Sequence, residues 1–277
     1  MTNPTTPTEG NQTMEATATV HALMPARDVG VTRPVATLRE VCETTWRCGH
    51  CQLREQCLPS SLSLEDLDGM RDAMHGHRRI KRGEALYQAG DSFRSIYAVR
   101  LGFLKSYIVT EDGRSQITGF QMAGDVLGMD GIDTEAHTLS AIALEDSDVC
   151  VFPYAQLETA SSRVPGLLRQ IHRVMSREMV REHGVMLLLG TMRAEERVAT
   201  FLLNLSQRFM VRGYAGGEFN LRMTREEIGS YLGLKLETVS RILSRFQECG
   251  LITTRNRYVR IVDKRGLGAL AGRTAVG

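Results

Sequence analysis

Hydrophobic segments of two kinds are missing from this 277-residue chain. The first twenty residues, MTNPTTPTEGNQTMEATATV, contain neither the basic region nor the apolar stretch of a secretory signal. No apolar run approaches the roughly 18 to 20 residues that a membrane helix requires. We therefore expect a cytoplasmic protein without a membrane partner. Cysteines stay reduced in that compartment, so the six in this chain are not expected to form a disulfide framework.

Recognisable catalytic patterns are also lacking. The sequence contains neither an HExxH motif nor a glycine loop that cradles phosphate. Its seven histidines, among them His50, His137 and His183, are scattered along the chain. Because a catalytic site needs a nucleophile with a base or another polar constellation, the sequence does not favour an enzyme.

The formal net charge of +2 hides an uneven distribution of charged residues. From Gly190 onward the chain has 15 basic and 8 acidic residues, whereas the preceding part has 19 basic and 24 acidic ones. The basic end is where a polyanion would bind, although a solvated helical face would show much the same bias. Charge alone leaves nucleic-acid binding and an ordinary solvated surface about equally open.

Composition and hydrophobic pattern divide the chain into segments. The start is rich in Thr, Pro, Asn and Glu without apolar periodicity, which predicts disorder. Between residues 80 and 153, short apolar stretches alternate with glycine turns, and Asp112-Gly113 is a hairpin signal. This pattern predicts an antiparallel β sandwich or barrel. The expected boundaries are 1–38 for a tail, 39–164 for the cysteine segment and β domain, 165–190 for a long helix, and 191–277 for a C-terminal domain.

The long helix carries apolar residues at heptad spacing, and such a seam requires a partner helix. Glu178 and Glu182 interrupt the seam. In a parallel homodimer Glu182 would face its own copy at a cost in free energy, unless the helix is rotated so that the carboxylate stays in water. A dimer weakened in this way is open to control from elsewhere in the chain. The residues expected at the dimer interface are Leu168, Ile171, Met175, Met179, Glu182, Val185, Met186 and Leu189.

Residues 223–252 have the pattern of two short helices joined by a turn. Thr224 and Glu227 form a capping box, and Gly233 turns the chain between the helices. The second helix has an apolar face made by Val239, Ile242, Leu243 and Phe246. This arrangement is typical of the helix-turn-helix, which places its second helix in the major groove. The outward residues expected to contact DNA are Glu237, Thr238, Ser240, Arg241, Ser244 and Arg245.

The outward face of this second helix has the chemistry that base recognition needs. Arginine donates two hydrogen bonds to guanine, and glutamate accepts one from cytosine. The alternative is that Glu237 and Arg241, one turn apart, form an intrahelical ion pair of little energy. The basic excess and the following hairpin, LITTRNRYVRIV, which would contact phosphates as a wing, favour DNA binding.

The stretch CGHCQLREQC at 48–57 places three cysteines at the spacing of metal ligands. A CxxC pair with a third cysteine is typical of structural zinc, and the residues alone favour zinc over an iron-sulfur cluster. A reversible disulfide between Cys48 and Cys51 is a third reading. However, redox CxxC motifs usually open a helix beside a βαβ unit, and no such unit is expected here.

Taken together, these motifs resemble the CRP/FNR superfamily of transcription regulators, and within it the oxygen-sensing branch typified by the fumarate and nitrate reduction regulator. The resemblance covers residues 42–273. It implies an α+β fold with an antiparallel jelly-roll sensor domain of the cyclic-nucleotide-binding type, a long dimerisation helix and a C-terminal winged helix-turn-helix. It is carried by CGHCQLREQC, GFLKSYIVTEDGRSQITGFQMAGDVLG, ALEDSDVCVFP, LLLGTMRAEERVATFLLNLSQRF and the ETVSR of the second helix.

The resemblance also implies a cofactor. In the oxygen-sensing branch, three N-terminal cysteines and one on a later strand hold a [4Fe-4S] cluster, and the matching positions here are Cys48, Cys51, Cys57 and Cys150. This match reverses the preference for zinc. It implies that under anaerobic conditions the cluster promotes a homodimer that binds a palindromic TTGAT/ATCAA-type site, and that oxygen destroys the cluster and releases DNA. The alternative is a zinc- or thiol-based redox regulator of the same fold without a cluster.

Two further partners follow from the resemblance. Family members contact RNA polymerase through surface loops, for which the hairpin tip at Asp112 and Gly113 is the candidate. Cyclic-nucleotide-responsive relatives surround the phosphate with a Gly-Glu pair and an Arg-Ser pair. The corresponding stretch here, GDVLGMDGIDTEAHTLSAIALE, contains no arginine, so we expect no cyclic nucleotide to bind.

The chain departs from the family pattern at several positions. Gln52 and Gln56, beside the expected ligand cysteines, replace smaller or apolar side chains, and Glu182 stands where the family prototype has Asp. The glutamines could alter how fast oxygen reaches the cluster. Cys42 and Cys249 match no ligand position, and Cys249 is expected to be a packed, unreactive side chain.

Overall fold

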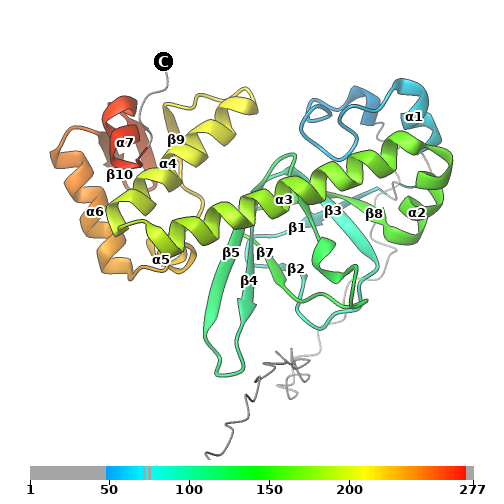
Figure 1. Ribbon diagram of the computed structural model, residues 1–277, viewed down its shortest axis with the longest axis horizontal. Coiled ribbons are helices and arrows are strands. Elements are labelled where there is room, and N and C mark those ends of the chain that lie inside the picture. Colours follow the sequence, from blue (N-terminus) through cyan, green and yellow to red (C-terminus); the bar gives the residue numbers. More distant parts are fainter. Residues whose placement is uncertain (1–47, 71–72, 74–75, 273–277) are drawn as a thin grey trace, which may run out of the picture. The chain divides into compact units, whose positions relative to one another are not determined.

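The computed structural model describes residues 48–70, 73 and 76–272. The predicted tail over 1–38 and Cys42 therefore lie outside the described residues. The described chain begins with a 3-10 turn, η2 (Cys48–His50), and a short helix, α1 (Leu64–Gly69). Figure 1 shows both at the blue end of the colour scale, ahead of the first strands.

The part of the chain between α1 and residue 153 is a sandwich of two antiparallel sheets, each four-stranded within the described residues. Val99, Leu104 and Val149 are buried between the sheets. This confirms the predicted antiparallel sandwich. One sheet has the order β1 (His77–Ile80), β8 (Ser147–Pro153), β3 (Ser95–Leu101) and β6 (Val126–Leu127), and the other β2 (Ala85–Tyr87), β7 (Ser140–Ala143), β4 (Phe103–Val109) and β5 (Ser115–Met122).

Two glycine turns of this sandwich matter for function. Gly113, with a φ of 82°, closes the β4–β5 hairpin next to Asp112, as the sequence predicts. Gly124, with a φ of 93°, turns the chain from β5 into β6. A positive φ at both positions favours glycine, because a Cβ atom strains the backbone there. A 3-10 turn, η4 (Met129–Gly131), follows β6.

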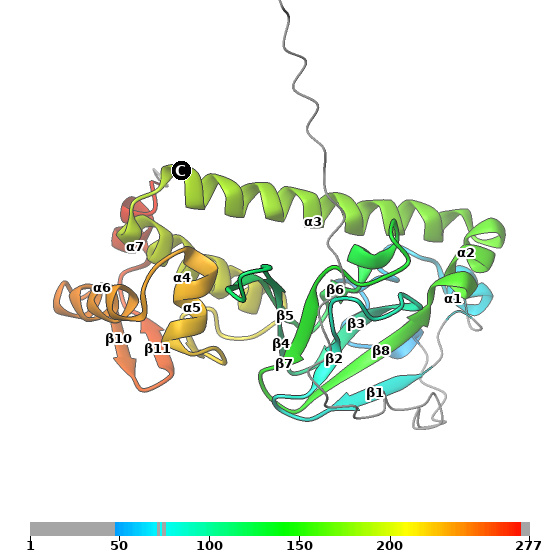
Figure 2. The same cartoon turned by 90° about the horizontal axis from the view of Figure 1, so that it is seen from below.

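Two helices follow the sandwich, α2 (Tyr154–Arg163) and α3 (Pro165–Thr191). Pro165 opens α3 at the first helical turn, where proline costs no hydrogen bond. The N-terminal half of α3 packs Leu167 and Val174 into the same apolar cluster as residues of β3 and β8, and Figure 2 shows the helix running beside these strands. Within the described residues, no helix is long and apolar enough to cross a membrane.

The C-terminal part is a winged helix-turn-helix. The Thr224 and Glu227 capping box is confirmed, because the Glu227 amide donates to Thr224 Oγ1 at 3.1 Å and the Thr224 amide donates to Glu227 Oε2 at 2.7 Å. Gly233, with a φ of 64°, makes the predicted turn between the helices. The elements are α4 (Ala194–Val211), β9 (Glu218–Asn220), α5 (Arg225–Leu232), α6 (Leu236–Glu248), β10 (Ile252–Arg255), β11 (Tyr258–Ile261) and α7 (Lys264–Leu270).

One apolar core holds these C-terminal helices together. The predicted inward residues of α6, Val239, Ile242, Leu243 and Phe246, are all buried in the cluster that contains Leu202 of α4. The strands form an antiparallel sheet in the order β10-β11-β9, with the β10–β11 hairpin as the wing. The α+β class is therefore confirmed. The domain boundaries drawn from the sequence stay a prediction.

Candidate cysteine centre and DNA-contacting surface

Three of the predicted ligand cysteines lie in residues 48–57, which we call the cysteine loop. Consecutive tight turns shape this loop, since the Cys51 amide donates to the Cys48 carbonyl at 3.2 Å and the Cys57 amide to the Leu53 carbonyl at 3.0 Å. The fourth, Cys150, lies in the middle of β8, between Ala98 of β3 and His77 of β1. Cys57 and Cys150 both belong to the apolar cluster beneath α2 and α3.

Cys57 and Cys150 lie in one apolar cluster, and the charges of Cys48 and Cys51 act on both of them. Burial, followed by the neighbouring charge of Cys51, raises the pKa of Cys48 to about 11. Burial, followed by Cys48 and Cys51, raises the pKa of Cys150 to about 12. Burial and then Cys150 raise the pKa of Cys57 well above its ordinary value. A cysteine binds a metal centre as the thiolate, so each of the four would become a ligand once its proton is displaced.

The donor set has the softness that an iron-sulfur cluster needs, namely four thiols. Over residues 48–70, 73 and 76–272, no group of three or more His, Cys, Asp or Glu side chains is close enough to hold one metal ion. Four thiolates also suit structural zinc, so the donor set alone is compatible with either centre.

The cysteine loop and the residues just after it are tied to α3. The Gln170 side chain donates to Ser60 Oγ at 2.6 Å, and both residues are buried. Arg173, one turn later on α3, donates to Ser61 Oγ at 3.3 Å on the surface. A shift of the cysteine loop must therefore disturb either these bonds or the position of α3.

Beyond this contact, α3 exposes an apolar stripe to solvent. Met179 is 57% exposed and Met186 67% exposed, which are large fractions for methionine in a folded protein. Of the predicted interface residues, the structure exposes Leu168, Met175, Met179, Glu182 and Met186, whereas Ile171, Val185 and Leu189 are half-buried within the same chain. Two further apolar residues that the heptad reading missed, Val180 and Leu187, are exposed beside this stripe.

Glu178 is not part of the exposed stripe. It is half-buried, and it pairs with Arg181 at 2.5 Å. Burial raises the pKa of Glu178 above its ordinary value, partly offset by the Arg181 charge. Of the two glutamates that the sequence placed in the seam, only Glu182 is exposed as a seam residue would be.

The outward face of α6 is accessible. Glu237, Arg241, Ser244 and Arg245 are exposed, and Thr238 and Ser240 are half-buried. Among the described residues, no ion pair joins Glu237 to Arg241, and Arg245 instead lies 3.5 Å from Glu195. The intrahelical pair that competed with base recognition is thus not formed.

Positive charge continues from α6 into the wing. Arg255, Arg257 and Arg260 are exposed on the β10–β11 hairpin. Arg257 donates to the Arg222 carbonyl at 3.2 Å, which fixes one of these side chains beside the hairpin. Exposed arginines flanking a recognition helix provide phosphate contacts, which set the affinity and register of a DNA-binding protein.

The stretch that corresponds in the sequence to the phosphate site of cyclic-nucleotide binders contributes a ring stack and a hydrogen-bonded carboxylate. The His137 ring stacks on Tyr87 with ring centroids 3.8 Å apart, and His137 is 3% exposed. Asp130 accepts hydrogen bonds from the amides of Thr138 at 2.8 Å and Leu139 at 3.0 Å. Burial alone would raise the pKa of Asp130, but the His137 and Leu139 hydrogen bonds lower it overall, so the carboxylate is ionised.

Comparisons with known proteins agree with this architecture. Residues 77–163 match the cyclic nucleotide-binding domain family, and residues 196–270 match the Crp-like helix-turn-helix domain family. The chain is 47% identical to the transcriptional activator protein FnrA of Stutzerimonas stutzeri over 81% of this chain and 92% of that protein. It is 43% identical to the fumarate and nitrate reduction regulatory protein of Salmonella typhimurium, over 82% of this chain and 91% of that protein.

A solved structure is similar as well. FixK2 from Bradyrhizobium japonicum matches with a TM-score of 0.66 and 33% sequence identity, over 72% of this chain and 98% of that one. The sequence and structural similarities therefore span both the sandwich and the winged helix-turn-helix.

Proposed function

The chain belongs to the CRP/FNR family of transcription regulators, and from this premise we propose that it is an oxygen-responsive regulator controlled through its cysteine loop. The observation that carries the proposal is that Cys57 of the loop lies in one apolar cluster with Cys150 of β8, close enough to Cys48 and Cys51 for their charges to act on it. These thiols come from two segments that are distant in the sequence. A cofactor bound by all of them would link the two segments, and its loss would break that link.

We propose Cys48, Cys51, Cys57 and Cys150 as the ligands of a [4Fe-4S] cluster, which supplies a centre that oxygen destroys. Ligation ties the cysteine loop to β8. Because Ser60 and Ser61 follow the loop and accept hydrogen bonds from Gln170 and Arg173, the loop position then reaches α3. Release of the thiols frees the loop from β8, and because Gln170 of α3 stays bonded to Ser60, a shift of the loop moves α3.

A homodimer through α3 is the second step. Met175, Met179 and Met186 supply an exposed apolar stripe, and Glu182 places a carboxylate in it. In a parallel pair the two Glu182 side chains repel each other, which keeps the dimer weak unless α3 is held in the favourable position. Loop position thereby controls dimerisation through α3.

DNA recognition follows from the dimer. Two exposed α6 faces, one from each protomer, reach successive major grooves when they lie about one helical turn of DNA apart. Glu237, Ser240 and Arg241 match the family positions that read TTGAT/ATCAA-type half-sites, so the same palindrome is proposed here. DNA binding requires the compartment that holds the chromosome, which agrees with the expected cytoplasmic location.

Activation through RNA polymerase is proposed at the β4–β5 hairpin. Asp112 at its tip is exposed and pairs with Arg114 at 2.7 Å, and Thr110 donates to Asp112 at 2.5 Å. These bonds fix the shape of a surface loop. A fixed, charged loop suits contact with a second protein, and the relatives named above include a transcriptional activator.

Cyclic nucleotides are not proposed as ligands. The corresponding stretch, residues 124–145, contains the ionised Asp130 and His137, whose ring stacks on Tyr87 of β2. A phosphodiester there would meet the negative charge of Asp130, and the stretch itself contains no arginine. A zinc- or thiol-based regulator of the same fold remains the alternative, because the same four thiols also suit zinc.

The test is anaerobic purification with iron, acid-labile sulfide and zinc analysis, and with the visible spectrum and mass recorded before and after air is admitted. We expect about four irons and four sulfides per chain, a brown colour that bleaches in air, and a dimer that falls toward monomer. A colourless protein that holds zinc or no metal after anaerobic reconstitution, and binds DNA equally well in air, would contradict the proposal.

A further inference from the structure

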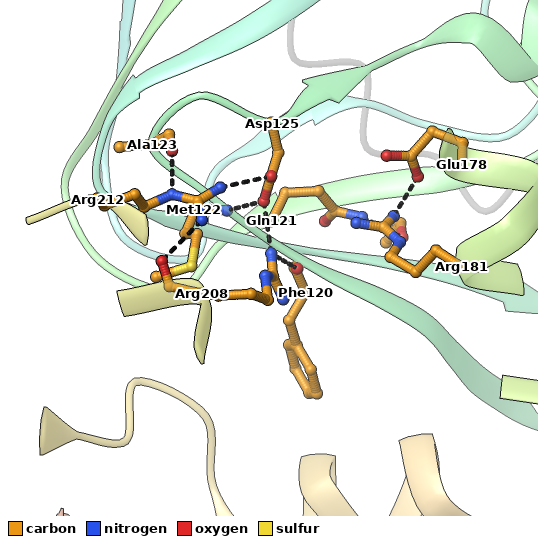
Figure 3. A network of polar contacts seen from close by, with 10 residues as sticks. Phe120, Gln121, Met122, Ala123, Asp125, Glu178, Arg181, Arg208 and Arg212 are labelled. Carbon is orange, nitrogen blue, oxygen red and sulfur yellow. Dashed lines mark hydrogen bonds and ion pairs between the residues drawn. The ribbon is translucent and has the colours of Figure 1, made fainter. Parts of the chain in front are cut away.

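The turn between β5 and β6 is fastened to α4 by a charged clamp, which we define as Asp125, Arg208 and Arg212 (Figure 3). Arg208 Nη2 lies 2.5 Å from Asp125 Oδ2, and Arg212 Nη2 lies 2.7 Å from Asp125 Oδ1. Each arginine also donates to a backbone carbonyl of the sensor sandwich, Arg208 to Phe120 at 2.8 Å and Arg212 to Ala123. Four hydrogen bonds thus join α4 to one short turn.

The side chains of the clamp are mostly buried, and Asp125 is held in its charged form. The side-chain exposure is 16% for Asp125, 18% for Arg208 and 6% for Arg212. Burial alone would raise the pKa of Asp125, but the two arginines and Arg181 of α3 outweigh it and hold the pKa below its ordinary value. Charge-assisted bonds in such a partly dry setting are directional, so they fix orientation as well as distance.

Gln56 of the cysteine loop touches both sides of this clamp. Its amide Nε2 donates to the carbonyl of Val211 at 2.6 Å, and Val211 directly precedes Arg212. On the other side, a Cβ atom built at Gly124 would lie 3.1 Å from the Cβ of Gln56, and Gly124 directly precedes Asp125. Gln56 is itself the residue before Cys57, so the residue that contacts both flanks of the clamp adjoins a proposed ligand position along the chain.

Holding α4 in place also holds the recognition helix. α4 shares one apolar core with α5 and α6, in which Leu202, Ile228 and Val239 are buried together. A second anchor acts on α5, where Lys105 of β4 lies 2.8 Å from Glu227. Other contacts join the two parts as well, among them Ile117 of β5 with Ser230 of α5 at 3.0 Å and Glu145 with Arg222 at 3.1 Å. The orientation of α6 relative to the sensor sandwich is therefore set at several points, and Gln56 of the cysteine loop bonds directly beside the clamp.

We propose that Gln56 and the clamp are positioning elements that carry the state of the cysteine loop directly to the DNA-binding domain of the same protomer. This route is separate from the route through α3, and for its input it rests on the proposed function. A palindrome requires two recognition helices at a fixed spacing. The clamp supplies the fixed orientation within each protomer, while the α3 dimer supplies the pairing.

Two substitutions test the route. Gln56→Glu keeps the side-chain length but loses the donor toward the Val211 carbonyl, and Gln52→Glu is its matched control, because Gln52 adjoins Cys51 and is exposed. Asp125→Asn removes the charge of the clamp. Its control is Asp146→Asn, which removes an exposed ion pair with Lys81 on the same sandwich.

The measurement uses full-length, cluster-loaded protein under anaerobic conditions at concentrations where sedimentation shows a dimer. We expect Gln56→Glu and Asp125→Asn to weaken binding to a duplex with both half-sites by about tenfold, the equivalent of one lost hydrogen bond per complex or more. Iron per chain, dimer mass and binding to a duplex with one half-site should match the controls. A two-site Kd equal to that of the controls, or an equal loss on the single half-site, would overturn the proposal.

Failure of the cluster hypothesis is separately visible. If the unsubstituted protein takes up no iron, the proposed function fails, and the route is then tested by amide hydrogen exchange on the metal-free chain. We expect amides of residues 122–125 and 205–213 to exchange about tenfold faster in Gln56→Glu and Asp125→Asn than in their controls, because an opened contact exposes them more often. Equal exchange in all four variants would overturn the route without reference to the cluster.

Discussion

The segment that carries the cysteines reaches two helices by contacts of different character. Toward α3, Gln170 and Ser60 bond at 2.6 Å with both side chains buried. Toward α4, Gln56 bonds to Val211 on the surface of the protein. A buried bond persists in every folded state because leaving its partners unsatisfied is costly, whereas a surface bond opens at little cost. The first contact therefore suits a permanent support of the loop and the second a contact that changes with its state.

The largest expected effect comes from removing the input common to both contacts. Cys57→Ser is nearly isosteric but replaces a buried soft ligand with a hard hydroxyl. We expect iron per chain to fall from about four to background, together with anaerobic dimerisation and palindrome binding. Cys249 follows α6 directly and is exposed, so the prediction that it is packed is wrong. Because it matches no ligand position, Cys249→Ser should leave iron content unchanged. Iron uptake that survives Cys57→Ser would remove this cysteine from the ligand set.

The second effect in size concerns the clamp. Asp125→Asn leaves two poorly exposed arginines short of their counter-charge, for which a cost of about 3 kcal/mol in domain docking is typical. The lowered pKa of Asp125 decides how its contribution to stability changes with pH. Its contribution is fully present above the unfolded pKa of about 3.9 and is lost as the pH falls through the lower folded value.

Thermal unfolding of the unsubstituted protein should therefore show an acid limb below about pH 4 that is weaker in Asp125→Asn. The groups facing Asp125 are Arg208 of α4, Arg212 directly after α4, and Arg181 of α3 with its partner Glu178. Because Glu178 also titrates in acid, a double-mutant cycle of Asp125→Asn with Arg212→Gln is the control. Additive effects of these two substitutions would contradict direct coupling between them.

The third effect tests the buried contact. Gln170→Ala leaves Ser60 without its partner, so we expect the free energy of unfolding to fall by about 1 to 3 kcal/mol. Arg173→Ala, which removes the surface bond to Ser61 one turn later, should cost less than about 0.5 kcal/mol. Equal losses in chemical denaturation would mean that the two bonds do not differ in the way that burial indicates.

The recognition helix and the clamp differ in how well the sequence predicts them. The recognition helix is predictable because Val239, Ile242 and Phe246 recur at helical spacing, and local periodicity decides which face is buried. The clamp is not predictable from such a pattern. Asp125 joins residues 83 and 87 positions away, and a lone aspartate after a glycine indicates only a turn.

The dimer helix lies between these cases. α3 has apolar residues on two faces, and the sequence assigns Val185 and Met186 to the same interface. In the structure Val185 is half-buried, whereas Met186 is exposed. Periodicity identifies an amphipathic helix, but two apolar faces on one helix are told apart only by what packs against each. The cysteine centre likewise depends on β8, which brings Cys150 to the loop. The spacing of the CxxC motif cannot predict this long-range contact.

The smallest expected effect sharpens the role of α3 alone. Glu182 is exposed in the apolar stripe, so Glu182→Ala should remove repulsion in the dimer and tighten it by about three- to tenfold, the equivalent of a weak surface charge interaction. Glu178→Ala is the control, because Glu178 faces its own chain and pairs with Arg181. Sedimentation of metal-free protein measures both. If α3 only pairs the protomers while the clamp orients them, Glu182→Ala should raise the dimer fraction in air. The Kd of the assembled dimer for the duplex with both half-sites should stay unchanged. An equal gain in dimer fraction and in DNA affinity would show that pairing and orientation are one event.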